Sequence, residues 1–189
     1  MNPRINPSGS LAEAISRISK LAELLARPCA VIGGAAMVLR ARPRPTFDVD
    51  LVVQATRADL DSILALAATL GFALIDDPAA RELAEEGLVQ LDGPSGETES
   101  LGADLIFVDS PYLERVVRRA TVMEGPFSVP IATPEDLLLL KLEAGRPIDL
   151  DDAIALKDVY EAELDRQYLR EQGDLLGLRG KLESLLGPL

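Results

Sequence analysis

Residues 45–53 read PTFDVDLVV, a segment with the residue types of a buried β-strand and two carboxylates inside it. Side chains of a strand alternate between its faces, so the apolar residues at odd positions, Phe47 to Val53, should share a buried face. Asp48 and Asp50 then share the other face, where two charges repel each other and lose hydration energy. A cation between them would remove that cost; the alternative is that this face is wet, at an edge or end of a sheet.

Upstream of the pair, Gly33 and Gly34 lie at a predicted strand-to-helix turn. Backbone N–H groups at such a turn can bind phosphate, and glycine lets the ligand come close. Arg40, Arg42 and Arg44 follow, before the Asp pair. Arg44 can hold phosphate with two parallel hydrogen bonds. The alternative is that the three arginines form a solvated loop that balances nearby acids.

A second predicted strand, residues 103–109, carries a single acid among its apolar residues, Asp104, and ends at Asp109. If this strand pairs with the first, Asp104 joins Asp48 and Asp50. Three carboxylates and phosphate oxygens can hold two magnesium ions, which activate an attacking oxygen and stabilise a leaving one. The chain has no histidine, so a metal site must use oxygen ligands, which favours Mg²⁺, Mn²⁺ or Ca²⁺ over zinc.

The remaining pattern predicts a mixed α/β fold, of the α+β kind, because strands and helices are mixed without strict alternation. The further predicted strands are 29–32, 72–75, 87–91 and two short ones within 121–132, with a hairpin loop at 92–100. The predicted helices are 10–27, 35–40, 56–70, 78–86, 110–120, 133–145, 149–160, 165–172 and 174–187.

Length and composition suit one structural domain of 189 residues with 48% hydrophobic residues. We expect an α/β core with an N-terminal helix at 1–132 and a helical segment packed on it at 133–189. No apolar run is long enough for a membrane span, and a single cysteine makes a cytoplasmic location the default. The net charge of −12 argues against a broad grip on a nucleic-acid backbone.

The segment GGAAMVLRARPRPTFDVDLVV, residues 33–53, resembles the signature of the nucleotidyltransferase superfamily. Two small residues open a helix, a basic loop with a threonine follows, and D-x-D lies on a strand. The Gly-Gly form with R-x-T-x-D-x-D is similar to the AbiEii-type and related minimal nucleotidyltransferases, many of them members of toxin–antitoxin pairs. Residues 132–156 also resemble their C-terminal segment, so the resemblance covers roughly residues 29–160.

The resemblance implies a nucleotidyltransferase-like fold, with a central mixed sheet flanked by helices, and a role for each matching residue. Gly33 and Gly34 would lie against the triphosphate. Asp48 and Asp50 would bind Mg²⁺ or Mn²⁺, and Asp104 would be the third carboxylate, orienting the metal and the attacking hydroxyl. The predicted phosphate-binding set is completed by Arg44, Thr46 and Lys141.

Several of these residues have other interpretations. Thr46 can simply bond the backbone of its loop. Lys141 lies on an apolar helix face, where a lysine usually extends to water; it can also neutralise an unpaired carboxylate. Asp149 and Asp152 lie one helical turn apart and can face the site, or Asp149 can be an ordinary acid of a helix N-terminus.

These observations predict a Mg-dependent nucleotidyltransferase that moves a nucleoside monophosphate from a nucleoside triphosphate to a hydroxyl. The acceptor would be a tRNA end, a protein side chain or a small molecule. The second hypothesis is a nucleotidyltransferase-like binding module without turnover, acting as an antitoxin by contact with a partner protein. In either case the resemblance implies a cognate toxin or antitoxin as a partner, while the lack of a long apolar run predicts no membrane association.

Overall fold

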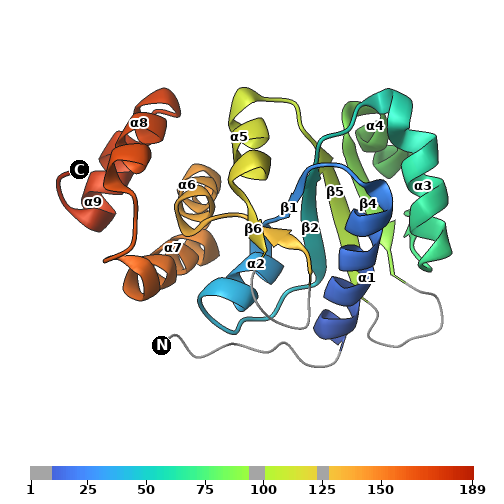
Figure 1. Ribbon diagram of the computed structural model, residues 1–189, viewed down its shortest axis with the longest axis horizontal. Helices are drawn as coiled ribbons and strands as arrows, with labels where there is room; N and C mark the ends of the chain where they lie inside the picture. Colours follow the sequence, from blue (N-terminus) through green and yellow to red (C-terminus); the bar gives the residue numbers. More distant parts are fainter. Residues whose placement is uncertain (1–9, 94–100, 123–127) are drawn as a thin grey trace.

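The computed structural model describes residues 10–93, 101–122 and 128–189. Within these ranges, seven strands form one mixed sheet with helices around it (Figure 1). The strands are β1 (Cys29–Val31), β2 (Asp48–Val53), β3 (Ala73–Leu74), β4 (Leu88–Asp92), β5 (Gly102–Phe107), β6 (Thr121–Val122) and β7 (Pro130–Ile131). The helices are α1 (Ser10–Leu25), α2 (Gly33–Arg40), the short 3-10 helix η1 (Arg57–Asp59), α3 (Leu60–Thr69), α4 (Pro78–Glu86), α5 (Pro111–Arg119), α6 (Pro134–Ala144), α7 (Pro147–Tyr160), α8 (Arg166–Leu175) and α9 (Arg179–Leu186).

The sheet has the strand order β3-β4-β5-β2-β1-β7-β6. β2 runs parallel to β5 and β1 runs parallel to β7, while the other neighbours are antiparallel. The predicted mixed α/β class, with a central mixed sheet and a helical C-terminal part, is therefore confirmed. Figure 1 shows α6 to α9 gathered beyond the edge that carries β6 and β7, with α3 and α4 toward the opposite end.

The middle strand, β2, is buried according to its sequence pattern. Val49 and Leu51 are fully buried, whereas Asp48 and Asp50 on the other face are only partly so. Phe47 corrects one expectation: it lies in the bend before the strand, and its side chain is 84% exposed rather than part of the core. Because β2 lies in the middle of the sheet, the two aspartates lie at the start of a central strand and not on an edge strand.

Element boundaries differ from the predictions by a few residues, mostly where glycine or proline acts. α2 already begins at Gly33, and α7 begins at Pro147, because proline is well suited to a first helical turn. The last predicted helix is shorter, because α8 continues to Leu175 and Gly177 then turns the chain with φ 68°. Most of the predicted loop at 92–100, together with Gly125 and Pro126, lies outside the described residues.

The C-terminal helices are joined to the sheet through Arg40, at the end of α2. Its guanidinium donates to the carbonyls of Ala132 (2.7 Å) and Ile131 (3.0 Å), and its backbone carbonyl accepts from the hydroxyl of Tyr160 (2.9 Å). Arg40 is 9% exposed, so it is a buried connector and not part of a solvated loop. Among the described residues, no helix has the length and apolarity needed to cross a membrane.

Candidate metal and nucleotide site

Asp48, Asp50 and Asp104 form one cluster, here named the acid trio. The parallel register of β2 and β5 places Asp50 opposite Asp104, and Asp48 lies on the same face of β2 as Asp50. One carboxylate oxygen of each residue lies within 4.8 Å of the other two. The structure thus brings together the three carboxylates that the sequence could only place on two separate strands.

Within the part of the chain that the structure describes, the acid trio has no ion-pair partner. None of the ion pairs among the described residues includes one of its members. Burial, and then the charges of Asp48 and Asp104, raise the pKa of Asp50 from 3.8 to about 6, against smaller opposing effects from Lys141 and the Gly34 backbone. Three hard oxygen ligands that repel one another fit a divalent cation such as Mg²⁺ or Mn²⁺.

Gln90 is a member of this site that the sequence analysis missed. β4 pairs with β5 so that Gln90 lies opposite Asp104. Burial and the charge of Asp48 raise the pKa of Asp104, while a side-chain hydrogen bond from Gln90 lowers it. The available signal was a single amide among the apolar residues of the predicted strand GLVQL. Gln90 therefore contributes to the site from β4, the strand next to that of Asp104.

The glycine pair lies against both the trio and the basic loop. Gly33 has a φ of 62°, and a Cβ at this position would overlap the Asp50 carboxylate. A Cβ on Gly34 would clash with Thr46 Oγ1 and lie 2.8 Å from Arg44 Nη2. Gly33 therefore requires glycine, and a side chain at Gly34 would have to displace Thr46 and Arg44, so the start of α2 approaches the carboxylates by backbone alone.

Thr46 and Arg44 are oriented by contacts within their loop. The Thr46 hydroxyl donates to the carbonyl of Asp48 (3.1 Å), which is the loop-bonding role considered above. Arg44 Nη1 donates to the carbonyl of Pro45 (3.3 Å), and Arg44 Nε lies 3.3 Å from Asp152 Oδ2. The Arg44 side chain is only 14% exposed, so this arginine is not part of a solvated loop either.

Lys141 lies at the centre of a second cluster, whose acids Asp149 and Asp152 are here named the acid pair. Its ammonium is 2.9 Å from Asp149 Oδ1 and 3.0 Å from Asp152 Oδ2, and the residue is 5% exposed. Of its three interpretations, neutralisation of carboxylates is observed, and extension to water is not. Both acids are fully buried, and their charges are balanced by lysine and arginine side chains.

In the acid pair, the pKa of Asp149 is shifted in the opposite direction to that of Asp50 in the trio. Burial alone would raise the pKa of Asp149, but hydrogen bonds from Arg146 and Lys141 lower it to about 2. Asp149 also lies in the first turn of α7, so the ordinary helix-acid interpretation holds as well. Asp149 therefore remains charged without help from a bound ion.

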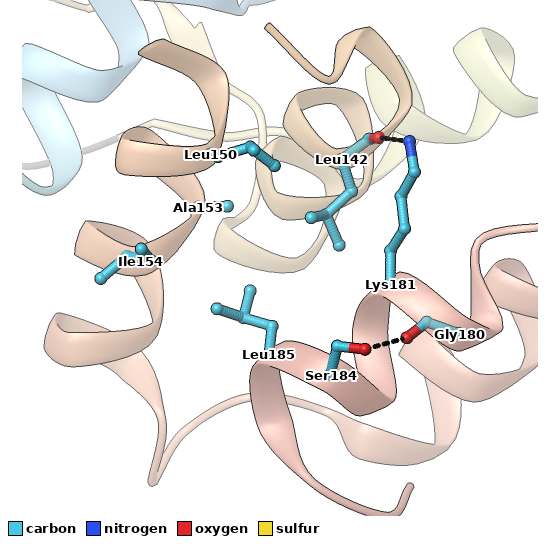
Figure 2. A pocket seen from close by; sticks show the side chains of 8 residues that line it. All are labelled: Leu142, Leu150, Ala153, Ile154, Gly180, Lys181, Ser184 and Leu185. Atoms are coloured by element: carbon cyan, nitrogen blue, oxygen red, sulfur yellow. Dashed lines mark hydrogen bonds between the residues drawn. The ribbon is translucent and has the colours of Figure 1, made fainter. Parts of the chain in front are cut away.

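A groove in the C-terminal helices is separate from these clusters. It has a volume of about 410 Å³ and lies among α6, α7 and α9, lined by apolar side chains such as Leu150 and Leu185. Figure 2 shows Lys181 reaching across one end to donate to the carbonyl of Leu142. Its lining includes no member of the acid trio or the acid pair, so the candidate site is not this groove.

No protein-family model matches the chain, and neither does any curated protein. Solved structures are similar over most of its length. A nucleotidyltransferase-like antigenic protein from Paracoccidioides brasiliensis has a TM-score of 0.57 at 20% identity, covering 94% of this chain and 92% of the other. JHP933 from Helicobacter pylori has a TM-score of 0.56 at 17% identity, covering 95% and 80%.

A third similar structure is ANT(2'')-Ia in complex with adenylyl-2''-tobramycin. It has a TM-score of 0.55 at 12% identity, covering 88% of this chain and 96% of the other. At these identities the likeness is one of fold. The chain therefore has the nucleotidyltransferase-like fold that its sequence resemblance implied.

Proposed function

We propose that this protein is a metal-dependent nucleotidyltransferase that moves a nucleoside monophosphate from a nucleoside triphosphate to a hydroxyl group. The observation that carries the proposal is the acid trio: three carboxylates that form no ion pair within the described residues, beside a glycine pair at a helix start. The nucleotidyltransferase-like fold of the chain supports the same reaction class. We infer that Asp48, Asp50 and Asp104 hold Mg²⁺ or Mn²⁺, which would activate the acceptor and stabilise the leaving pyrophosphate.

The chain's own residues position the reactants. Asp104 orients the acceptor hydroxyl and takes its proton, as a carboxylate with a raised pKa can. The hydroxyl oxygen forms a bond to the α-phosphorus, while the bond from that phosphorus to pyrophosphate breaks and pyrophosphate leaves with the electron pair. The backbone at Gly33 and Gly34 lies against the phosphates, and positive charge comes from Arg44 and Lys141.

The net charge supports some acceptors over others. At −12, the protein repels a long polyanion, so we place small-molecule and protein hydroxyls ahead of a tRNA end. ANT(2'')-Ia, with the same fold, is seen with adenylyl-2''-tobramycin, in which the adenylyl group is on a small hydroxylated molecule. This supports a small acceptor for the present protein, and all three classes belong in the test.

We also propose that the protein acts with a partner as one half of a toxin–antitoxin pair. The support is the AbiEii-like arrangement of Gly33-Gly34 and Thr46-x-Asp48-x-Asp50. Induced expression in a bacterial host should then arrest growth in the wild type and not in Asp50→Asn. Growth arrest by both proteins, or by neither, would remove the toxin role.

The transfer reaction is tested with each of the four nucleoside triphosphates carrying a label at the α-phosphate. The purified protein is incubated with Mg²⁺ and with tRNA, cell protein or a pool of small hydroxylated compounds. Wild type should label one acceptor class, and Asp50→Asn should be slower by about a thousandfold or more, the loss of about 4 kcal/mol of transition-state stabilisation. Asp61→Asn on α3 is the matched control, because it removes an exposed aspartate away from the trio.

The outcomes separate the two hypotheses for this fold. Labelling that is equal in wild type and Asp50→Asn would exclude the acid trio as the reaction site. No labelling by wild type with any triphosphate, in a protein that still binds a partner, would favour the binding module without turnover. Labelling by Asp61→Asn at the wild-type rate would show that losing one aspartate charge elsewhere does not slow the transfer reaction.

A further inference from the structure

The acid pair and the basic loop form a buried ion network beside the trio. From α7, Asp152 contacts three cations: Arg42 donates to its Oδ1 with two nitrogens (3.2 and 3.0 Å), and Arg44 and Lys141 lie at its Oδ2 (3.3 and 3.0 Å). Asp152 has no exposed surface. One carboxylate thus fixes side chains from two distant segments, the loop after α2 and helix α6.

Two of these cations face the proposed phosphate site. Arg44 Nη2 lies so close to Gly34 that a Cβ there would be 2.8 Å away, which places the guanidinium over the start of α2. The charge of Lys141 acts on Asp50. The Arg44 guanidinium therefore lies next to Gly34, and Lys141 is near enough to Asp50 for its charge to act there, at the two features to which we assign the phosphates and the metal.

Two buried polar atoms of this network lack a hydrogen bond. Arg44 Nε and Asp152 Oδ2 are both buried, and neither has a hydrogen-bond partner although they are 3.3 Å apart. Buried polar atoms in native proteins are nearly always paired. Arg44 Nη2 makes no hydrogen bond within the described residues, so the guanidinium is held near its acid by charge and keeps two donors available.

We propose that Asp152 is a positioning residue for polyphosphate binding, acting through Arg44 and Lys141. It holds the Arg44 guanidinium over Gly34 and the Lys141 ammonium 3.0 Å from its own Oδ2 before the ligand arrives. Preorganised charge of this kind binds phosphate without the entropy loss of ordering two long side chains. The inference rests on the proposed function, because it assumes that the triphosphate binds beside the glycine pair and the trio.

The alternative for Asp152 is a purely structural ion cluster, and the chain contains a matched example. Asp136 on α6 is also fully buried, and it accepts from Arg119 Nε (3.1 Å) and Thr133 Oγ1 (2.9 Å), away from the trio. Asp136→Asn therefore removes the same charge from the same depth without touching Arg44 or Lys141. It is the control for any effect of Asp152→Asn that comes from stability alone.

The probe is inorganic tripolyphosphate with Mg²⁺, titrated calorimetrically into each folded variant. Asp152→Asn should weaken its binding by about tenfold to a hundredfold, as expected when the partner that orients ligand-binding side chains is lost. Mn²⁺ binding in the absence of phosphate, measured by electron paramagnetic resonance, should be unchanged, because the trio is intact. Asp136→Asn should bind tripolyphosphate like wild type, whatever its stability.

A double-mutant cycle tests whether Asp152 acts through Arg44. Arg44→Ala alone should weaken tripolyphosphate binding, and Asp152→Asn should add clearly less in that background than in wild type. Effects that add fully, or wild-type affinity in Asp152→Asn, would overturn the proposal. If Asp152→Asn does not fold, wild-type affinity in Arg44→Ala overturns it in the same way.

Failure of this inference and failure of the proposed function are distinguishable. A protein that binds tripolyphosphate in an Asp152-dependent way but transfers no nucleotide would keep the positioning role and lose the enzyme. A protein whose transfer needs Asp50, but whose tripolyphosphate affinity ignores Asp152, would keep the enzyme and lose the positioning role.

Discussion

The acid trio and the acid pair are two carboxylate clusters of one molecule with opposite charge balance. The trio has three acids and no ion pair among the described residues, and the pKa of Asp50 is raised to about 6. The pair has two fully buried acids bound by lysine and arginine, and the pKa of Asp149 is lowered to about 2. The more deeply buried cluster is therefore the one that the protein neutralises itself. The other has the charge balance that the proposed cation from solution would complete.

The largest effect is expected when an acid is removed from the acid pair, whose charges are neutralised by lysine and arginine. Asp149→Ala should lower the free energy of unfolding by about 3–5 kcal/mol, because it leaves buried cations short of an anion. Urea unfolding at neutral pH measures this loss. The double variant Lys141→Met with Asp149→Ala should be more stable than Asp149→Ala alone. If the double variant is the less stable of the two, the pair is not a compensated ion cluster.

Removing a charge from the trio should instead raise the free energy of unfolding. Because the folded-state pKa of Asp50 lies above its unfolded value of 3.8, wild type loses stability as the pH rises from about 4 through about 6. Asp50→Asn lacks this loss, so without metal it should exceed wild type by up to about 3 kcal/mol at pH 7 and match it near pH 4. Thermal unfolding across this range measures the difference. A pH-independent difference, as expected for the exposed control Asp61→Asn, would contradict the assigned electrostatics.

A divalent cation should stabilise the trio and not the pair. At about 100 times its dissociation constant, Mg²⁺ or Mn²⁺ should add about 2.7 kcal/mol to the free energy of unfolding. Asp104→Asn should lose this gain, whereas Asp149→Asn should keep it despite its lower starting stability. Melting curves with and without a chelator provide the measurement. A gain that depends on Asp149 would place the cation in the wrong cluster.

The smallest effect is expected at the rim of the pair. The Arg146 side chain is 69% exposed, although its Nε lies 2.6 Å from Asp149 Oδ2. Arg146→Ala should cost less than about 1 kcal/mol, as exposed ion pairs usually do, because Lys141 still neutralises Asp149. Urea unfolding beside Asp149→Ala gives the comparison. A loss as large as that of Asp149→Ala would mean that Arg146, and not Lys141, is the partner that matters.

The trio was largely predictable because its geometry depends on local rules. Alternation along a strand puts Asp48 and Asp50 on one face, and a lone acid in another strand gives Asp104 as the third member. Whether the two strands pair is not a local property, and the sequence left it conditional. The fold class followed from the same kind of pattern, since strand and helix periodicity depend on near neighbours.

The pair was less predictable because its partners come from distant segments. Lys141, Asp152 and Arg44 lie on α6, α7 and the loop after α2, and their contacts depend on how the C-terminal helices dock on the sheet. Phe47 shows the limit at short range, since one bend before β2 removes it from the face that alternation assigned to it.

The parallel pairing of β2 and β5 also has a consequence for how the molecule folds. A parallel connection cannot close through a tight turn, and here α3, β3, α4 and β4 intervene between the two strands. Contacts between strands that are so far apart in the sequence form slowly, because the chain loses entropy on closing the loop before the contact stabilises it. Asp104 therefore reaches Asp50 only when this half of the sheet is assembled. In refolding experiments, recovery of cation binding should follow recovery of helical signal, and a nascent chain that ends before β5 has no trio.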